Sequence, residues 1–345
     1  MKKILTAISA AVVLVAMVIV ISFAPTGFVI WTPSTTASVL DASPDQTGIQ
    51  IYGRTSVSSG PLLAPSINQS GRDEVVTLPA VIFAHLMGHG RVVPRDTVYL
   101  SGQASNDTAD QYNSQVLSSR ESAVVAALRY AEVVVTERPM VASVREGGPA
   151  DGLLELGDLI LEIDSHPMET DEDVRSYVRD HNVDDSIVVK VLRDREQLAV
   201  SIRLGASPAN RFVPTMGVRS IVMGYEYDPD IAIGLEIASG HPSQGLAIAL
   251  ATYSLWMEVD LSSGETLAAT GTVSAAGVVS AVSGINQYAR SAWNAGATLL
   301  LIPRANCPDL TEEFAGLAIV PVDTLGQAVS TLTGRNLPDV APAHC

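Results

Sequence analysis

Lysine is the scarcest charged residue in this chain of 345 residues. Of its 21 basic residues only Lys2, Lys3 and Lys190 are lysines, and the other 18 are arginines. A P-loop needs a lysine directly after its glycine-rich turn to contact the nucleotide phosphates, and no lysine here follows such a turn. The sequence therefore excludes a P-loop ATPase module, and we expect neither ATP nor another cofactor.

Positive charge is also in short supply. Acidic residues number 37, so the formal net charge is −16, which argues against a nucleic-acid-binding protein because such a protein needs a basic face. Only 17% of the residues are charged, whereas 47% are hydrophobic. A chain of this length and composition can bury substantial cores in two or three domains.

Residues 4–24 contain no charged side chain and follow Lys2 and Lys3. A run of this length can cross a bilayer as a helix, and the positive-inside rule places the N-terminus in the cytoplasm and the rest outside. Residues 1–25 are thus predicted to be a cytoplasmic tip and an uncleaved anchor of a single-pass membrane protein. A cleaved signal peptide is the alternative, although "ISFAPTG" is a poor cleavage site.

Cysteine occurs only twice, at Cys307 and Cys345. Outside the cytoplasm thiols tend to pair, so the predicted topology favours a disulfide between these two residues.

Residues 26–132 are interpreted as a separate N-terminal extracytoplasmic region. Its runs "VVTLPAVIFAHL" and "DTVYL" indicate strands, and a helix is predicted to follow from Asp107. His85 and His89 have a spacing that can bind a metal on a helix, but two glycines and the lack of a neighbouring carboxylate argue against it. We expect no metal site.

Residues 133–205 contain "GGPADGLLELGDLILEIDSHPM", a strand, a small-residue turn and a second strand. Gly157 suits the tight turn, Leu159, Leu161 and Ile163 alternate as in a strand, and Asp171–Asp180 is predicted to be a short helix. The segment closes with a predicted hairpin, "VVKVLRDREQLAVSIRL". This pattern resembles a bacterial-type PDZ domain.

The resemblance implies that an extended peptide or an unfolded protein segment binds by strand addition. We expect the groove between a strand that contains Met140, Val141 and Val144 and a helix that contains Val174 and Val178. "TERPM" stands where the glycine-rich carboxylate-binding loop is expected, which argues against recognition of a free C-terminus. The alternative is a PDZ fold that serves only as a spacer.

Residues 213–345 are predicted to form one α/β unit with buried strands at "TLLLIP" and "AIVPV" and helices at 243–257, around "INQYARSAWNAGA" and at 324–333. The order of "GHPSQG", "AATGT", "SAVSGINQYA" and "LLLIPRANCPDL" resembles the proteolytic domain of Lon proteases. That resemblance implies a ribosomal-protein-S5-domain-2-like fold and, because Lon domains form rings, a homo-oligomer. The whole chain resembles the membrane-anchored, PDZ-containing Lon-like proteins of Gram-positive bacteria.

In this family a serine nucleophile works with a lysine base, and the resemblance puts Ser243 at the nucleophile position. The two family lysines fall on Asn286 and Tyr288, with Tyr288 at the catalytic position. The interval from Gly271 to Tyr288 is 17 residues, as the family pattern requires, so the alignment is not shifted. No lysine follows Lys190, and the usual base is therefore missing.

Three other residues bear on this site. Thr270 matches a supporting family threonine, while His241 and Tyr288 are candidate rescue bases. Gln244 replaces a small residue beside the nucleophile, and Ser243 by its own neighbours is expected to be a helix N-cap.

The favoured hypothesis is a pseudoprotease, a membrane-anchored serine peptidase homologue that binds or regulates protein substrates. An active, ATP-independent serine endopeptidase with a base other than lysine is the alternative, and a structural envelope protein is a third class.

Overall fold

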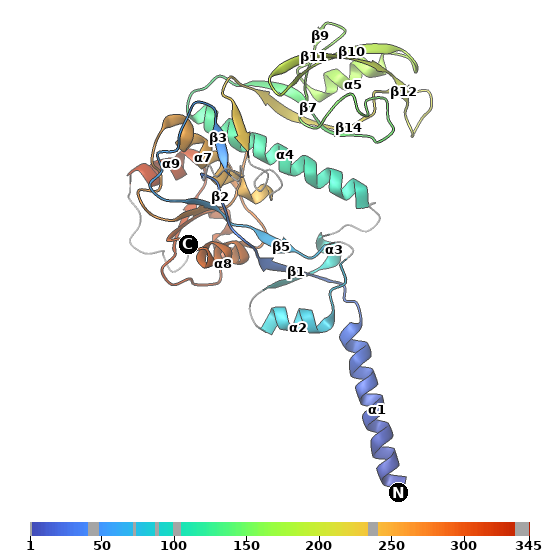
Figure 1. Cartoon of the computed structure of the whole chain (residues 1–345), viewed down its shortest axis with the longest axis vertical. Helices are drawn as coiled ribbons and strands as arrows, with labels where there is room; N and C mark the ends of the chain where they lie inside the picture. The colour runs from blue at the N-terminus through green and yellow to red at the C-terminus, as the bar shows by residue number, and fades with distance from the viewer. Residues whose placement is uncertain are drawn as a thin grey trace.

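The computed structural model describes residues 2–40, 48–71, 74–86, 90–98, 105–233, 241–334 and 345. Figure 1 shows a long N-terminal helix, α1 (Lys2–Phe23), that projects from the body of the molecule. The body consists of a small sheet near the end of α1, a central α/β unit, and a second β-rich unit at the far end.

Nowhere in these described ranges does a helix combine the length and the apolar character needed to cross a bilayer. The anchor at residues 4–24 stays a prediction.

A five-stranded sheet forms the centre of the α/β unit, in the order β2-β4-β16-β19-β20. Its strands are β2 (Ala37–Ser38), β4 (Leu62–Ala64), β16 (Leu267–Ala269), β19 (Leu299–Pro303) and β20 (Ala318–Val322). The last four pair in parallel, and β2 joins β4 antiparallel. Since β2 and β4 belong to this sheet, the predicted boundary between a region at 26–132 and a domain at 213–345 is wrong.

Helices cover both faces of this sheet. Along β19, Leu299 and Leu301 face a core shared with helices α4, α7 and α9, while Leu300 and Ile302 face a second core shared with α8. This alternation is the period-2 pattern of a strand buried on both sides. The helices are α4 (Ser105–Tyr130), α7 (Gly245–Met257), α8 (Ile285–Asn294) and α9 (Leu325–Gly334). The predicted multidomain α/β architecture is confirmed.

The far unit is a sheet in the order β11-β10-β8-β7-β14, with a short β9 beside β8. Its elements are β7 (Thr136–Val144), β8 (Leu159–Ile163), β9 (His166–Pro167), α5 (Asp171–Arg179), β10 (Ser186–Arg193), β11 (Glu196–Arg203) and β14 (Val218–Glu226). A capping box at Thr170 and Asp173 starts α5, and Gly157 has the positive φ (96°) that its turn requires. The strand, helix and hairpin predicted at 159–204 are confirmed, but β14 lies beyond the predicted end of the domain.

The small sheet next to α1 has the order β5-β1-β6 and carries two helices. Its elements are β1 (Phe28–Pro33), β5 (Ile67–Gln69), α2 (Leu78–Leu86), β6 (Arg91–Pro94) and α3 (Arg95–Val98). The strand predicted at "LPAVIFAHL" is therefore wrong, because this segment is helix α2.

Three two-stranded pairs and two 3-10 turns complete the described structure. The pairs are β3 (Ile49–Ile51) with β15 (Ile231–Ile233), β12 (Gly205–Ala206) with β13 (Pro214–Thr215), and β17 (Thr272–Val273) with β18 (Val279–Ser280); the turns are η1 (Pro242–Gln244) and η2 (Arg304–Asp309).

Candidate functional site

Ser243 lies in η1, the turn that leads into α7. The backbone holds this turn against the strand connection at Gly271, since Gly271 N donates to Ser243 O at 2.7 Å and Leu246 N donates to Gly271 O at 2.9 Å. A Cβ at Gly245 would lie 3.0 Å from the Val273 nitrogen, so only glycine allows this close approach. The position of Ser243 is thus fixed by backbone contacts on both sides.

The side chain of Ser243 does not cap a helix. His241 is the N-cap of η1 and Gln244 that of α7, and neither helix start has a side-chain cap bond. Instead, Ser243 Oγ donates a hydrogen bond to Tyr288 Oη at 2.8 Å. The expectation of a helix cap is wrong because the hydroxyl has a better-placed acceptor on α8.

Tyr288 reaches Ser243 from the first turns of α8 and is only 4% exposed. Its ring packs in a cluster with Val29, Trp31 and Ile67 of the small N-terminal sheet. The structure therefore brings together the two residues predicted at the nucleophile and base positions, and it covers them with strands β1 and β5.

Thr270 is fully buried, and its Oγ1 donates to the backbone oxygen of Ser243 at 3.3 Å. Its contact is therefore with the turn and not with the reactive hydroxyl, which makes Thr270 a positioning residue. Gln244 is 2% exposed, and among the described residues its Oε1 has no hydrogen-bond partner. A buried amide oxygen in this position makes the turn narrower and more polar than a small residue would.

His241, the other candidate base, is partly buried at the start of η1. Burial lowers the pKa of its imidazole, and a hydrogen bond with the Ile67 backbone acts in the opposite direction. The ring is thus engaged with β5, on the N-terminal sheet.

Two amides of the turn are already used within it. Gln244 N donates to His241 O at 3.0 Å, and Gly245 N donates to Pro242 O. An oxyanion hole needs backbone N–H groups that point at the developing negative charge. These two donors are committed to the 3-10 turn instead.

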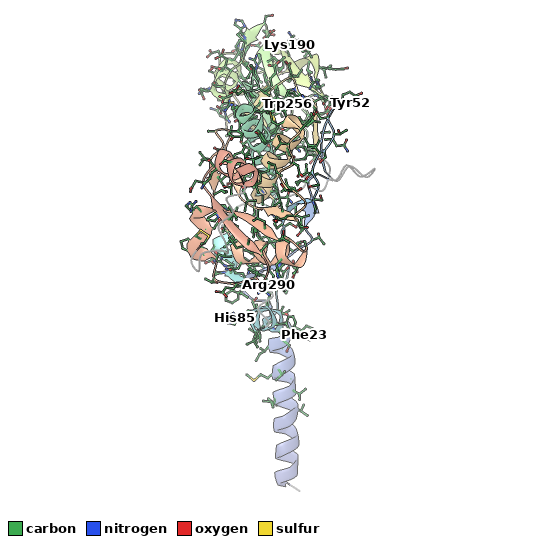
Figure 2. All side chains as sticks on the ribbon, turned by 90° about the vertical axis from the view of Figure 1, so that its left-hand side faces the viewer. Phe23, Tyr52, His85, Lys190, Trp256 and Arg290 are labelled. Carbon is green, nitrogen blue, oxygen red and sulfur yellow. A yellow bond between two sulfur atoms is a disulfide. The ribbon has the colours of Figure 1, made fainter. Side chains whose placement is uncertain are left out.

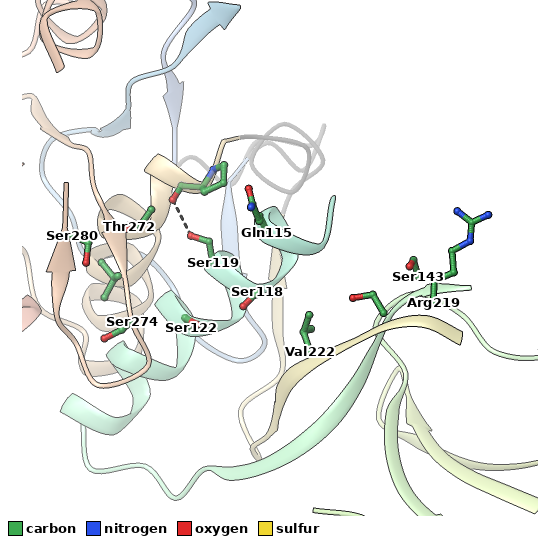
Figure 3. Close-up of a pocket in the computed structure, with 13 residues that line it drawn as sticks. Gln115, Ser118, Ser119, Ser122, Ser143, Arg219, Val222, Thr272, Ser274 and Ser280 are labelled. Atoms are coloured by element: carbon green, nitrogen blue, oxygen red, sulfur yellow. Dashed lines mark hydrogen bonds between the residues drawn. The ribbon is translucent and has the colours of Figure 1, made fainter. Parts of the chain in front are cut away.

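A cleft of about 830 Å³ opens beside η1, between α4, the β7–β14 edge of the far unit and the β17–β18 hairpin. Serine and threonine are the commonest residues in its lining and include Ser118, Ser122, Ser143 and Ser274 (Figure 3). Ser119 Oγ donates to Pro242 O at 2.9 Å and so links α4 to the turn that carries Ser243. Many rotatable hydroxyls in one cleft suit the amides of an extended polypeptide.

A second groove, of about 300 Å³, lies in the far unit between α5 and the edge strand β14. Its lining residues are Glu172, Val174, Arg175, Val178, Arg179, Pro214, Thr215, Met216, Val218, Arg219 and Ile221. Among the described residues β14 is an edge strand that pairs with β7, and its other edge lies beside α5, in a position that suits strand addition.

This arrangement corrects the predicted groove. Val174 and Val178 line it as expected, but Met140 and Val141 are buried at 3% and 0% inside the sheet, and β14 pairs with their strand. Val144 pairs with Val218 at the end of the same ladder.

The sequence contained a signal for the missing strand. In the structure Gly217, directly before β14, has a φ of 84°, and a Cβ there would lie 2.8 Å from Pro149 Cδ, so this position requires glycine. In the sequence the signal is this glycine followed by the segment "VRSIVMGY". The glycine-containing loop beside the groove is therefore Pro214–Gly217 and not "TERPM".

Cys307 and Cys345 form a disulfide with their Cα atoms 5.0 Å apart. The bond holds the last residue of the chain against the core beneath α8. Across the described ranges, the acidic, histidine and cysteine side chains form no group that could hold a metal ion.

Comparison with known proteins identifies both units. Residues 115–204 match the PDZ domain family, and residues 230–333 match the family of Lon protease (S16) C-terminal proteolytic domains. A "Probable periplasmic serine endoprotease DegP-like" of Rickettsia conorii is 33% identical over 70 residues, which is 20% of this chain and 14% of that protein. The chain thus spans about a seventh of the length of this curated relative.

Solved structures are similar to about a quarter of this chain. The PDZ domain of an SdrC-like protein from Listeria innocua is 30% identical over 25% of this chain and 92% of its own length, with a TM-score of 0.22. A Geobacillus thermodenitrificans protein is 38% identical over 23% of this chain and 91% of its own, also with a TM-score of 0.22. By its family matches, this chain is a multidomain α/β protein that contains a PDZ domain and a Lon-type (S16) C-terminal proteolytic domain.

Proposed function

We propose that this protein is a polypeptide-binding homologue of Lon-type serine peptidases that does not hydrolyse its ligands. In this hypothesis the PDZ groove and the hydroxyl-lined cleft hold an extended segment of another protein. The site at Ser243 serves structure and not catalysis.

The hydrogen bond from Ser243 Oγ to Tyr288 Oη carries this proposal. A serine hydroxyl becomes a nucleophile only when a base takes its proton. A neutral lysine amine can do so, but a neutral phenol cannot, and the phenolate forms only near a pKa of about 10. Ser243 and Tyr288 are 5% and 4% exposed, so the pair is shielded from solvent.

In the part of the chain that the structure describes, the groups near this pair offer no substitute base. The guanidinium of Arg290 stays protonated and forms an ion pair with Glu312 on the other side of α8. The ring of His241 is engaged with the Ile67 backbone. Gln244 N and Gly245 N, which follow the nucleophile position, donate within the turn.

Peptide binding is supported by the PDZ groove. Val174 and Val178 on α5 face Val218 and Ile221 of β14 across the groove. This arrangement supplies apolar pockets beside a strand edge that has no partner strand within the described ranges. Strand addition gives affinity through the main chain, and the pockets select side chains.

An active serine endopeptidase is the second candidate. The observation in its favour is the direction of the hydrogen bond, since Ser243 donates to Tyr288 as a nucleophile donates to its base. This mechanism needs a cationic group that stabilises the phenolate.

One experiment separates the two candidates. The wild type and the Ser243→Ala and Tyr288→Phe variants are treated with a fluorophosphonate probe and with a casein-like substrate. We expect all three proteins to be equally unreactive, because the hydroxyl is not activated. Labelling of the wild type that disappears in Ser243→Ala would establish an active nucleophile, and its loss in Tyr288→Phe would identify the base.

We also propose that the protein is anchored in the cell membrane by residues 4–24, with the N-terminus in the cytoplasm and both domains outside. The support is the uncharged run after Lys2 and Lys3. Protease added to intact cells should digest the PDZ and Lon-type domains while the N-terminal fragment stays in the membrane fraction. A fully soluble, N-terminally trimmed protein would contradict this topology. Self-assembly into a homo-oligomer is part of the same proposal, by analogy with Lon domains.

A further inference from the structure

Helix α2 (Leu78–Leu86) is an apolar helix whose side chains are mostly exposed to solvent. Its sequence, "LPAVIFAHL", is apolar on almost every side, yet Ala84 is its only buried residue. Ile82, Phe83 and Leu86 are 47%, 59% and 75% exposed. A helix that is apolar all round is normally buried in a protein core or in a bilayer. Something outside the described chain is therefore expected to cover α2.

The backbone fixes α2 at the end of α1. Thr26 donates to Val76 O twice, from its N at 2.9 Å and from its Oγ1 at 2.7 Å, and Pro25 forms an antiparallel bridge with Thr77. Figure 1 shows α2 lying crosswise to α1 at the level where α1 ends, with the rest of the body beyond it. Figure 2 places Phe23 and His85 together at this end of the molecule.

The segment that carries α2 contains no Asp, Glu, Lys or Arg. Between Glu74 and Arg91 the sequence has no aspartate, glutamate, lysine or arginine. Val75 and Phe23 are 62% and 76% exposed, so the apolar surface of α2 continues onto the last turn of α1. A surface that contacts water, or the polar rim of a protein interface, normally carries charged side chains.

We infer that α2 lies in the interfacial layer of the lipid bilayer beside α1, with Phe83 and Leu86 directed into the acyl chains. The inference rests on the proposed membrane attachment through residues 4–24 and extends it to a second contact. Interfacial helices that keep a charged face towards water bury their apolar face about 5–10 Å into the boundary between headgroups and acyl chains. Helix α2 has no such charged face, so we expect it to lie at least at that depth. The bilayer is favoured over a second copy of the chain because one continuous apolar surface joins α2 to α1.

A second membrane contact has a mechanical consequence. A single helix leaves the body free to rotate and tilt about one flexible point, whereas α1 and α2 together define a plane. The PDZ domain, at the far end of the body from α1, would then be held away from the membrane surface.

The test places a fluorophore on α2 in the full-length protein. Phe83→Cys supplies a single reactive thiol because Cys307 and Cys345 are paired, and the 59% exposure of Phe83 makes the change tolerable. The matched control is Phe212→Cys, which replaces a phenylalanine that is 75% exposed at the far end of the body. Each variant is labelled with an environment-sensitive dye and reconstituted into phosphatidylcholine–phosphatidylglycerol vesicles with and without spin-labelled lipid.

We expect spin-labelled lipid to quench the dye at position 83 several-fold more strongly than the dye at position 212. Adding Leu86→Asp should reduce the quenching at position 83 at least two-fold. If the protein floats with the vesicles but position 83 is quenched no more than position 212, the inference is overturned while the anchor stands. A blue-shifted but unquenched dye would assign α2 to a protein interface instead. A protein that does not float with vesicles at all would overturn both proposals.

Discussion

The PDZ domain and the Lon-type domain of this chain keep their family folds by different means. The PDZ core, from Val141 to Met216, comes from one continuous stretch of sequence. The Lon-type core combines residues from 39–64, 123–128 and 246–332. The first domain is therefore a local assembly, and the second exists only when distant parts of the chain meet.

The two candidate sites also differ in how strictly they depend on particular residues. The PDZ groove depends on an unpaired strand edge and a few apolar side chains, so many sequences can build it. In Lon-type peptidases, which the Ser243 site resembles, catalysis depends on one lysine amine, and here Tyr288 stands at that position in a hydrogen bond with Ser243. In the function proposed above, binding tolerates sequence changes that remove catalysis, and the Lon-type domain keeps its fold without its chemistry.

The largest expected effect comes from separating the domains. Residues 133–226 should fold alone, because the whole PDZ core and strand β14 lie within them. Residues 213–345 should not fold, because they lack β4 and the α4 residues of their core and expose the edge of β16. Circular dichroism and cooperative thermal unfolding of the two fragments measure this difference. A cooperatively folded 213–345 fragment would contradict the shared core.

The PDZ groove provides the next effect. Ile221→Asp replaces one of the groove's apolar side chains with a charge and should weaken binding to the best ligand in a decapeptide array about 10-fold or more, or about 1.4 kcal/mol. Val188→Asp, at a 45% exposed position of β10, is the control and should bind normally. Ser243→Ala should also leave this affinity unchanged. Fluorescence anisotropy measures all three, and equal affinities of Ile221→Asp and wild type would place the ligand elsewhere.

Tyr288→Phe tests the site in the Lon-type domain. The change leaves the buried Ser243 hydroxyl without its acceptor, and an unsatisfied buried hydroxyl costs about 1–3 kcal/mol. Denaturant unfolding should show this loss in the free energy of unfolding of the Lon-type domain alone. Ser243→Ala in the Tyr288→Phe background should recover part of it, since the orphan group is then removed. Full additivity of the two changes would argue against the bond.

The smallest effect concerns pH. Burial holds the pKa of His241 below its ordinary value of 6.5, so the unfolded chain binds more protons than the folded one when pH falls below that value. Stability of the Lon-type domain should therefore decrease as pH falls from about 6.5 towards the folded pKa, by at most about 1.4 kcal/mol per pH unit. His241→Asn should flatten this dependence in thermal unfolding between pH 7.5 and 5. An unchanged slope would show that the ring is not the titrating group.

Local patterns predicted the local structure well. The alternation of Leu159, Leu161 and Ile163 marked β8, and "TLLLIP" marked β19. The proximity of Ser243 and Tyr288 also followed from the family's order of motifs and the spacing between them. An insertion or deletion between the motifs would have put another residue in the place of Tyr288.

Elements without a local signature were missed. Helix α2 has no polar face and hence no 3.6-residue pattern, so its apolar run predicts a strand. The parallel pairing of β4 with β16 joins segments that lie far apart in the chain, and short buried strands carry no mark of their partner. Strand β14 lies outside the predicted domain bounds because its ladder partner, β7, is at the other end of the PDZ sequence.

The pairing of Leu62 with Leu267 also sets the order in which the molecule can form during synthesis. Strand β4 is made roughly two hundred residues before the strand that covers its edge, and closing such long loops is slow. The PDZ domain is complete before β16 is made, so we expect it to fold first and to bring the flanking segments of the Lon-type domain together at β7 and β14. In this order of folding, the PDZ domain holds the two chain segments of the Lon-type domain close together before that domain folds.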